Sequence, residues 1–112
     1  MKRVLFAIAL LLFPVPAMAF SCPRAVVYLG VNQGGYLVVG NGYGAWTICN
    51  LSLTYGATTK ESCAGWYSGL LTAKASARTV TIYFSPPDNS GITTCAALGD
   101  WTSRQPYFVE LD

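Results

Sequence analysis

The strongest constraint on the fold is a change of periodicity within residues 58–84. In the first half, apolar residues recur at intervals of three and four, as on one face of an amphipathic helix; they are Cys63, Trp66, Tyr67, Leu70, Ala73 and Ala77. In the second half, β-branched and aromatic residues alternate, which predicts a strand with Val80, Ile82 and Phe84 facing the core. The chain is therefore expected to pass from a helix that ends near Arg78 straight into a strand.

Two features describe the expected helix further. Thr58 followed three residues later by Glu61 has the form of a capping box, which predicts that the helix begins there. Gly65 and Gly69 each weaken a helix by roughly 1 kcal/mol relative to alanine. Burial of the apolar face must supply the difference, and the glycines would also let a neighbouring element approach closely.

Three strands are predicted before the helix. The first, residues 25–31, is β-branched and apolar and ends at an Asn-Gln-Gly-Gly turn, residues 32–35. Residues 36–39 continue as its hairpin partner. A second glycine-rich turn, residues 40–44, leads into the third strand, residues 45–51.

The chain after the helix is expected to form two or three strands. Residues 79–84 form the first, and residues 86–91 form a turn or loop. Residues 92–98 are expected to be extended around Cys95. A last strand over residues 107–111 would place Tyr107, Val109 and Leu111 on one face.

The N-terminus has the pattern of a secretory signal peptide, residues 1–19. Lys2 and Arg3 precede an apolar run, and Ala17-Met18-Ala19 has the small residues of a cleavage site. The apolar run is shorter than the about 20 residues that span a membrane, although an uncleaved anchor is the alternative. We expect residues 20–112 to form a single domain, periplasmic or secreted, with no membrane span after cleavage.

The charge of the chain argues against polyanionic partners. The formal net charge of +2 comes from Lys2 and Arg3, and the bases and acids of residues 20–112 balance. Such a chain lacks the basic surface that nucleic acid or anionic lipid requires. A neutral surface also favours self-association, so a homo-oligomer is considered.

All four cysteines lie after the signal sequence: Cys22, Cys49, Cys63 and Cys95. An even number of cysteines in an exported chain predicts two disulfides, each typically stabilising a fold by about 2 to 4 kcal/mol. A zinc site is disfavoured because no cysteine pair has zinc-ligand spacing and the chain contains no histidine. We expect no metal and no cofactor. Sequence alone leaves all three pairings of the cysteines open.

Catalytic patterns are lacking, so no enzymatic activity is expected. Without histidine, Ser-His-Asp and Cys-His arrangements are excluded. A carboxylate pair would have to come from five acids, of which Glu61 fits a helix cap and Asp112 ends the chain. Asp88 and Asp100 lie in turn-like segments. No phosphate-binding glycine motif is present.

Aromatic residues are the main indication of binding, because their flat faces and polar tips suit sugars or protein partners. Trp66 is expected in the core, and Trp46 either in the core or at an interface. Trp101 lies in the most loop-like sequence, between Gly99-Asp100 and Thr102-Ser103-Arg104. We therefore expect Trp101 to be an exposed contact residue, followed by Tyr43 and Tyr55.

The order of elements favours an α+β, mainly β fold: a small five-stranded OB-like barrel. In an OB-fold, one helix between strands three and four covers an open end of the barrel. This arrangement explains why a helix runs directly into a strand. The alternative is an open antiparallel sheet with the helix packed on one face.

Four segments carry a resemblance to known proteins: "WTICNLS", "ESCAGWYSGLLTAKASARTVTIYF", "CAALGDW" and "PYFVELD". They resemble a group of small exported proteins of gram-negative bacteria that has no established activity. The order of strands and helix also resembles the binding subunits of AB5 toxins, particularly of the subtilase cytotoxin type. Those OB-fold subunits form pentamers and bind host glycans. Their sugar-binding positions match no motif in this chain, so none is transferred.

The OB arrangement implies one disulfide pairing. Its first and fourth strands are antiparallel neighbours, which would bring Cys22 close to Cys95. Cys49, late in strand three, would lie near Cys63 in the first turns of the helix. We therefore expect the pairs Cys22–Cys95 and Cys49–Cys63.

Three functions from different classes are compatible with the sequence. The first is a glycan- or surface-binding module like a toxin binding subunit. The second is a periplasmic inhibitor or immunity-type protein with a protein partner. The third is a structural protein of the cell envelope that has no small ligand.

Overall fold

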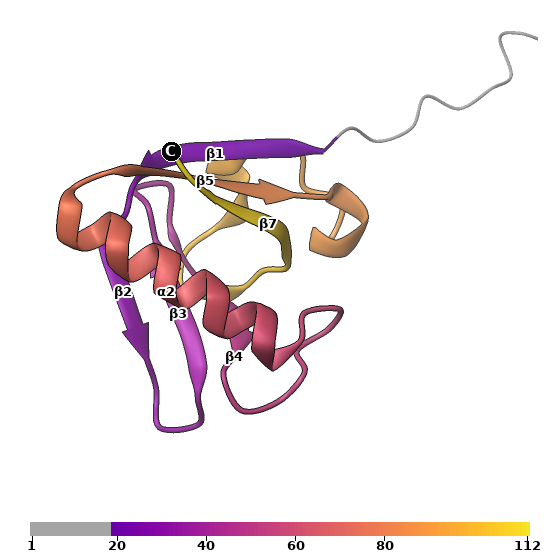
Figure 1. Cartoon of the computed structure of the whole chain (residues 1–112). Helices are drawn as coiled ribbons and strands as arrows, with labels where there is room; N and C mark the ends of the chain where they lie inside the picture. The colour runs from indigo at the N-terminus through magenta and orange to yellow at the C-terminus, as the bar shows by residue number, and fades with distance from the viewer. Residues whose placement is uncertain (1–18) are drawn as a thin grey trace, which may run out of the picture.

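The computed structural model describes residues 19–112, so the expected signal peptide lies almost wholly outside the described residues (Figure 1). The described chain contains one α-helix, α2, and seven strands. The strands are β1 (Phe20–Ala25), β2 (Tyr28–Val31), β3 (Tyr36–Gly40), β4 (Ala45–Asn50), β5 (Thr79–Phe84), β6 (Thr102–Ser103) and β7 (Pro106–Leu111). The helices are α2 (Lys60–Ser76) and two short 3-10 helices, η1 (Pro86–Asn89) and η2 (Cys95–Leu98).

The strands form two sheets. One has the order β1-β5-β7 and the other the order β2-β3-β4-β6. All neighbours are antiparallel except β4 and β6, which are parallel. The chain changes sheet four times: between β1 and β2, between β4 and β5, between β5 and β6, and between β6 and β7. The first and last of these connections are short, because only residues 26–27 and 104–105 separate the strands. At these two short connections the backbone passes directly from one sheet to the other.

The α+β class and the single helix before the strand at residues 79–84 are confirmed, but the expected closed five-stranded barrel is not formed in the described chain. The first expected strand, residues 25–31, is divided. Val26 turns into the core, and the next backbone bond, from Val27 N to Gly40 O (2.8 Å), already belongs to the other sheet. The last expected strand, residues 107–111, is present as β7, but the unexpected short strand β6 before it belongs to the other sheet. The strands therefore form two open sheets.

The core lies between the sheets and under α2. In Figure 1 the helix crosses in front of β2, β3 and β4, while β1 and β5 run above it. The helix contacts β5 and β7 of one sheet and β2 and β4 of the other. As predicted, Val80, Ile82 and Phe84 are buried. Phe84 packs edge-on against the buried Trp46, with ring centroids 5.4 Å apart. The alternation in β5 therefore supplies one wall of the core.

The helix begins one residue later than the capping box predicted. Thr59 is the N-cap, and its hydroxyl accepts a hydrogen bond from Ser62 N (3.1 Å). Thr58 cannot serve, because its backbone N–H and C=O both bond to Tyr55. The helix ends at Ser76, with Ala77 as a left-handed cap, close to the predicted position.

The helix glycines do not have the expected packing role. A side-chain carbon added at Gly65 or Gly69 would meet no atom within 4 Å. The expectation that a neighbouring element approaches them closely is therefore wrong. The buried face consists of Cys63, Leu70 and Ala73, with Trp66 and Tyr67 half-buried beside them.

Both predicted disulfides are present, Cys22–Cys95 and Cys49–Cys63. As expected, β1 pairs with β5, the strand that follows the helix. Cys22 in β1 reaches Cys95 because η2, which begins at Cys95, packs against β1. Cys49 in β4 reaches Cys63 in the first turn of α2. All four cysteines are consumed in these bonds.

Two expectations for the last third of the chain are wrong. The segment around Cys95 is not extended, because residues 95–98 form η2. The register of β5 and β7 shifts between Tyr83 and Phe84, which leaves Tyr107 as an extra residue. For that reason Tyr107 is 53% exposed. Of the two other residues expected on its face, Val109 is half-buried and Leu111 is 37% exposed.

Candidate functional site

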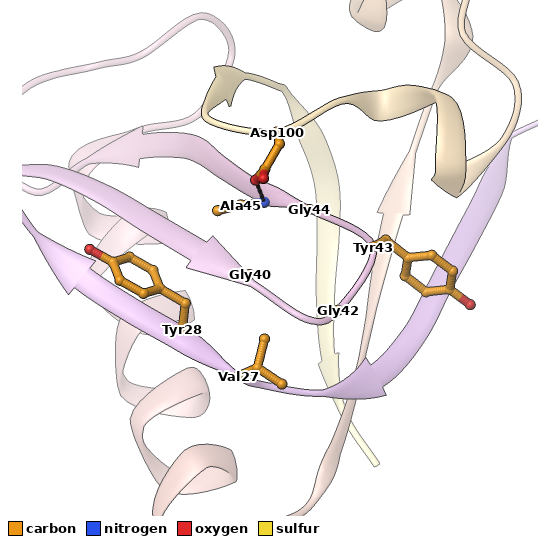
Figure 2. Close-up of a pocket in the computed structure, with 8 residues that line it drawn as sticks. All are labelled: Val27, Tyr28, Gly40, Gly42, Tyr43, Gly44, Ala45 and Asp100. Atoms are coloured by element: carbon orange, nitrogen blue, oxygen red, sulfur yellow. Dashed lines mark hydrogen bonds between the residues drawn. The ribbon is translucent and has the colours of Figure 1, made fainter.

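A shallow pocket of about 300 Å³ lies where β2, the 40–44 turn and the segment before β6 meet (Figure 2). The residues that line it are Val27, Tyr28, Gly40, Gly42, Tyr43, Gly44, Ala45 and Asp100. Three of the eight are glycines, so much of its surface is backbone. The Gly40 carbonyl is bonded to Val27 N, whereas Gly42, at the tip of the turn, is exposed.

Gly44 is required for this architecture. A side-chain carbon at Gly44 would overlap the carbonyl oxygen of Gly99. The 40–44 turn and the 99–101 segment therefore touch backbone to backbone. The indole of Trp46 supports the same contact by donating its Nε1–H to Gly99 O (3.0 Å).

The 99–101 segment is held in place by Ala45. Asp100 Oδ1 accepts a hydrogen bond from Ala45 N (2.8 Å), the bond drawn in Figure 2. Trp101 N donates to Ala45 O (2.7 Å). Both backbone groups of one β4 residue thus fix the positions of a carboxylate and a tryptophan.

Trp101 is displayed at the surface, as predicted. Its side chain is 68% exposed, the largest value among the exposed large apolar residues of the described chain. Its ring stands edge-on to Tyr28, with centroids 5.2 Å apart, and Tyr28 is itself 44% exposed. We refer to Tyr28 and Trp101 together as the aromatic platform.

The backbone of Trp101 is strained. Its φ is +53°, a left-handed conformation that is unfavourable for a bulky side chain. Ala77 and Ser90 share such a φ, but each caps a helix through its backbone N–H. Trp101 caps no described helix, and strain of this kind costs about 1 to 3 kcal/mol and clusters at functional sites.

Tyr43, the second predicted contact residue, lines the pocket, but its ring packs against Arg24 outside it. In Figure 2 its ring points away from the pocket, opposite to the direction of Tyr28. The guanidinium of Arg24 lies over this ring, 4.0 Å from its centroid. This cation–π contact fixes Tyr43 at the edge of the site.

Tyr55, the third predicted contact residue, is not part of this pocket. Its ring packs edge-on against Tyr36, with centroids 5.9 Å apart, at the start of β3. Burial raises the pKa of the Tyr55 hydroxyl, and the neighbouring Tyr36 adds to this effect. Of the three tryptophans, Trp46 is buried in the core and Trp66 is half-buried.

Sequence reasoning missed Tyr28, which it placed in a strand without a role. The signal that would have found it is the set of glycines around it. Tyr28 pairs with Gly40 across the hairpin, and its ring lies over Gly30, two residues along the same face. A tyrosine surrounded by residues without side chains cannot be buried by them, so its ring remains accessible.

The site combines apolar ring faces, one carboxylate and exposed backbone groups. Among residues 19–112, no three His, Cys, Asp or Glu side chains gather as metal ligands would. No helix in that same range has the length and apolar character to cross a membrane. Such a surface can bind a ligand that has both an apolar face and hydroxyl groups.

No family model, no curated protein and no solved structure matches this chain.

Proposed function

We propose that the protein is an exported, non-catalytic binding module that recognises glycans through the aromatic platform and the adjoining glycine-lined pocket. The observation that carries the proposal is the display of Trp101. A large apolar side chain is held 68% exposed at an unfavourable φ, next to Asp100 and against Tyr28. Strain that does not help the core is explained when the displayed ring has a binding role.

The chemistry of the platform suits sugars. The apolar face of a sugar ring packs against an indole or phenol, while its hydroxyls bond to polar groups around it. Asp100 and the backbone of Gly42 and Gly44 supply such groups. The balanced charge of residues 20–112 also favours a neutral ligand over a polyanion.

The order of strands supports an OB-like arrangement. Each strand has the neighbours of a five-stranded barrel if β1 with β2, and β6 with β7, each count as one interrupted strand. The sequence of neighbours is then β1/β2, β3, β4, β6/β7 and β5, which returns to β1. This order, with α2 before β5, is similar to that of the OB-fold toxin binding subunits. Because those subunits form pentamers, we propose that this protein also self-associates.

Two disulfides in a chain of this size indicate an oxidising, extracytoplasmic compartment. This supports a periplasmic or secreted location. A glycan-binding role is consistent with either, because both give access to cell-surface sugars.

The direct test is a glycan array probed with the oxidised protein recovered after export. We expect binding to a defined set of neutral glycans, and a loss of at least about tenfold in affinity for Trp101→Ala, the loss of about 1.4 kcal/mol or more that a stacked ring typically represents. Phe108→Ala is the matched control, because Phe108 is also an exposed ring (50%) but lies on β7. Equal binding by Trp101→Ala and the wild-type protein would refute the proposed site.

A second function is favoured by a different surface. The exposed rings of Tyr107 and Phe108 on β7 flank the half-buried Tyr83 on β5, with centroids 6.0 and 5.5 Å from that of Tyr83. An inhibitor or immunity-type protein would use such a face to bind a protein. It would then co-purify with its target in a one-to-one complex, and Phe108→Ala rather than Trp101→Ala would abolish binding. If the protein bound neither a glycan nor a protein target, the structural role in the cell envelope would be favoured.

A further inference from the structure

The geometry points to a second sugar-binding site, in a cavity of about 190 Å³ between the start of α2, η1 and the start of β7. The cavity shares no lining residue with the first pocket. Its functional side chains are Thr58, Ser62, Trp66, Asp88, Gln105 and Tyr107. The location of this second site is inferred from the geometry of the cavity alone, whereas its ligand class rests on the proposed glycan recognition.

The lining has the chemistry that a hydroxylated ring requires. Trp66 and Tyr107 offer aromatic faces from the helix and from β7. Two hydroxyls, one amide and one carboxylate offer both donors and acceptors. No lysine or arginine lines the cavity, which disfavours a phosphate or carboxylate ligand.

Gln105 is held in position by two neighbours. Asn89, which is buried, accepts a hydrogen bond from Gln105 N (2.8 Å) and donates one to Gln105 O (3.0 Å). Gly56 leaves the space that the Gln105 amide occupies, because a side chain at Gly56 would overlap it. The amide is therefore presented by a fixed backbone.

Both aromatic residues depart from the pattern of their elements. Trp66 belongs to the apolar face of α2, yet it is only half-buried. Tyr107 is the extra residue of the β5–β7 irregularity and is 53% exposed. Such irregularities re-aim side chains and are frequent next to functional sites. Here the departure brings Tyr107 to the wall of the cavity.

The volume limits what this site can hold. About 190 Å³ is below the 300 to 1,000 Å³ of typical ligand pockets, so the cavity takes a single sugar ring or the end of a chain. Two sites on one small domain allow bivalent attachment to a glycan-bearing surface, which raises the overall avidity without new contacts.

The test follows the three indole N–H resonances, one for each tryptophan, during titration of the oxidised protein. The probes are D-galactose, D-glucose and N-acetyl-D-glucosamine at millimolar concentration. We expect at least one probe to shift the Trp66 resonance, and the shift to persist in Trp101→Ala. Gln105→Ala and Tyr107→Ala are expected to weaken this response at least about tenfold, while Gln33→Ala, an exposed glutamine in the β2–β3 turn, leaves it unchanged.

The outcomes separate this inference from the proposed function. A Trp66 resonance that no probe moves, while that of Trp101 moves, overturns the second site and leaves the first. The reverse result supports the second site and removes the first. Gln105→Ala guards against loss of folding as an explanation, because it leaves the backbone bonds to Asn89 in place.

Discussion

At the scale of single residues, a left-handed backbone conformation occurs at two kinds of position. Ala77 and Ser90 cap helices, whereas Trp101 caps none of the described helices and has an exposed side chain. Ala77 ends α2 at φ +55° and is exposed. Glycine adopts this conformation without the cost that a β-carbon brings, so we expect Ala77→Gly to raise the free energy of unfolding by about 1 kcal/mol. Urea denaturation measures the change. Ala64→Gly, at an exposed position inside the helix, should lower it by a similar amount.

The Tyr83 hydroxyl gives a second prediction at this scale. It donates to Glu110 Oε1 (3.0 Å), and this hydrogen bond, with smaller effects of burial and of the charge on Glu110, raises the pKa of Tyr83 above its usual range. Because the folded-state pKa exceeds the unfolded value of about 10, the linked stability is present below pH 10. It is lost as the pH rises through the folded pKa.

A spectrophotometric titration, with Tyr83→Phe as the reference, isolates the Tyr83 transition. We expect Glu110→Gln to lower the pKa of Tyr83 toward the usual value, because the negative acceptor is gone. An unchanged titration curve in Glu110→Gln would show that the carboxylate is not the cause.

At the scale of elements, α2 contains two glycines that lower its helix propensity and make no close packing contact in return. Gly65 and Gly69 face open space. Replacing either with alanine should raise the free energy of unfolding by up to about 1 kcal/mol, measured by thermal or urea denaturation. Gly42→Ala is the contrasting control. Gly42 has φ +92°, so the same change is expected to destabilise there. Destabilisation by the helix substitutions would contradict the open environment.

Local patterns predicted most elements of this chain. The alternation of 79–84, the turn at 32–35 and the helix face around Cys63 and Leu70 all appear where expected. What failed depended on contacts distant in sequence. The bond of Val27 to Gly40 splits the first strand, and Tyr55 draws Thr58 away from the cap. Period and composition contain no information about either partner.

The candidate site was predictable to a similar extent. Trp101 was found because its neighbours are polar and turn-like, which is a local property. Tyr43 was only partly found, since the Arg24 that occupies its ring lies in another strand. Tyr28 was missed because its exposure depends on Gly40 across the hairpin. Placing a side chain at a site requires knowing which elements meet there.

At the scale of the whole molecule, the disulfides are expected to contribute unequally. Cys22–Cys95 spans 73 residues and Cys49–Cys63 spans 14. Loop-closure entropy then predicts losses of about 4.5 and about 3 kcal/mol when each is removed. Denaturation of the two double Cys→Ser variants measures this order. A larger loss for the Cys49–Cys63 pair would show that local packing on α2 outweighs chain entropy.

The central claim is that Trp101 is held at the surface to contact a glycan. The most direct measurement is the response of the indole N–H resonances to a glycan that the array identifies. We expect the Trp101 resonance to shift on binding, while that of Trp46, which is buried and bonded to Gly99, does not. A glycan that binds the protein without moving the Trp101 resonance would contradict it.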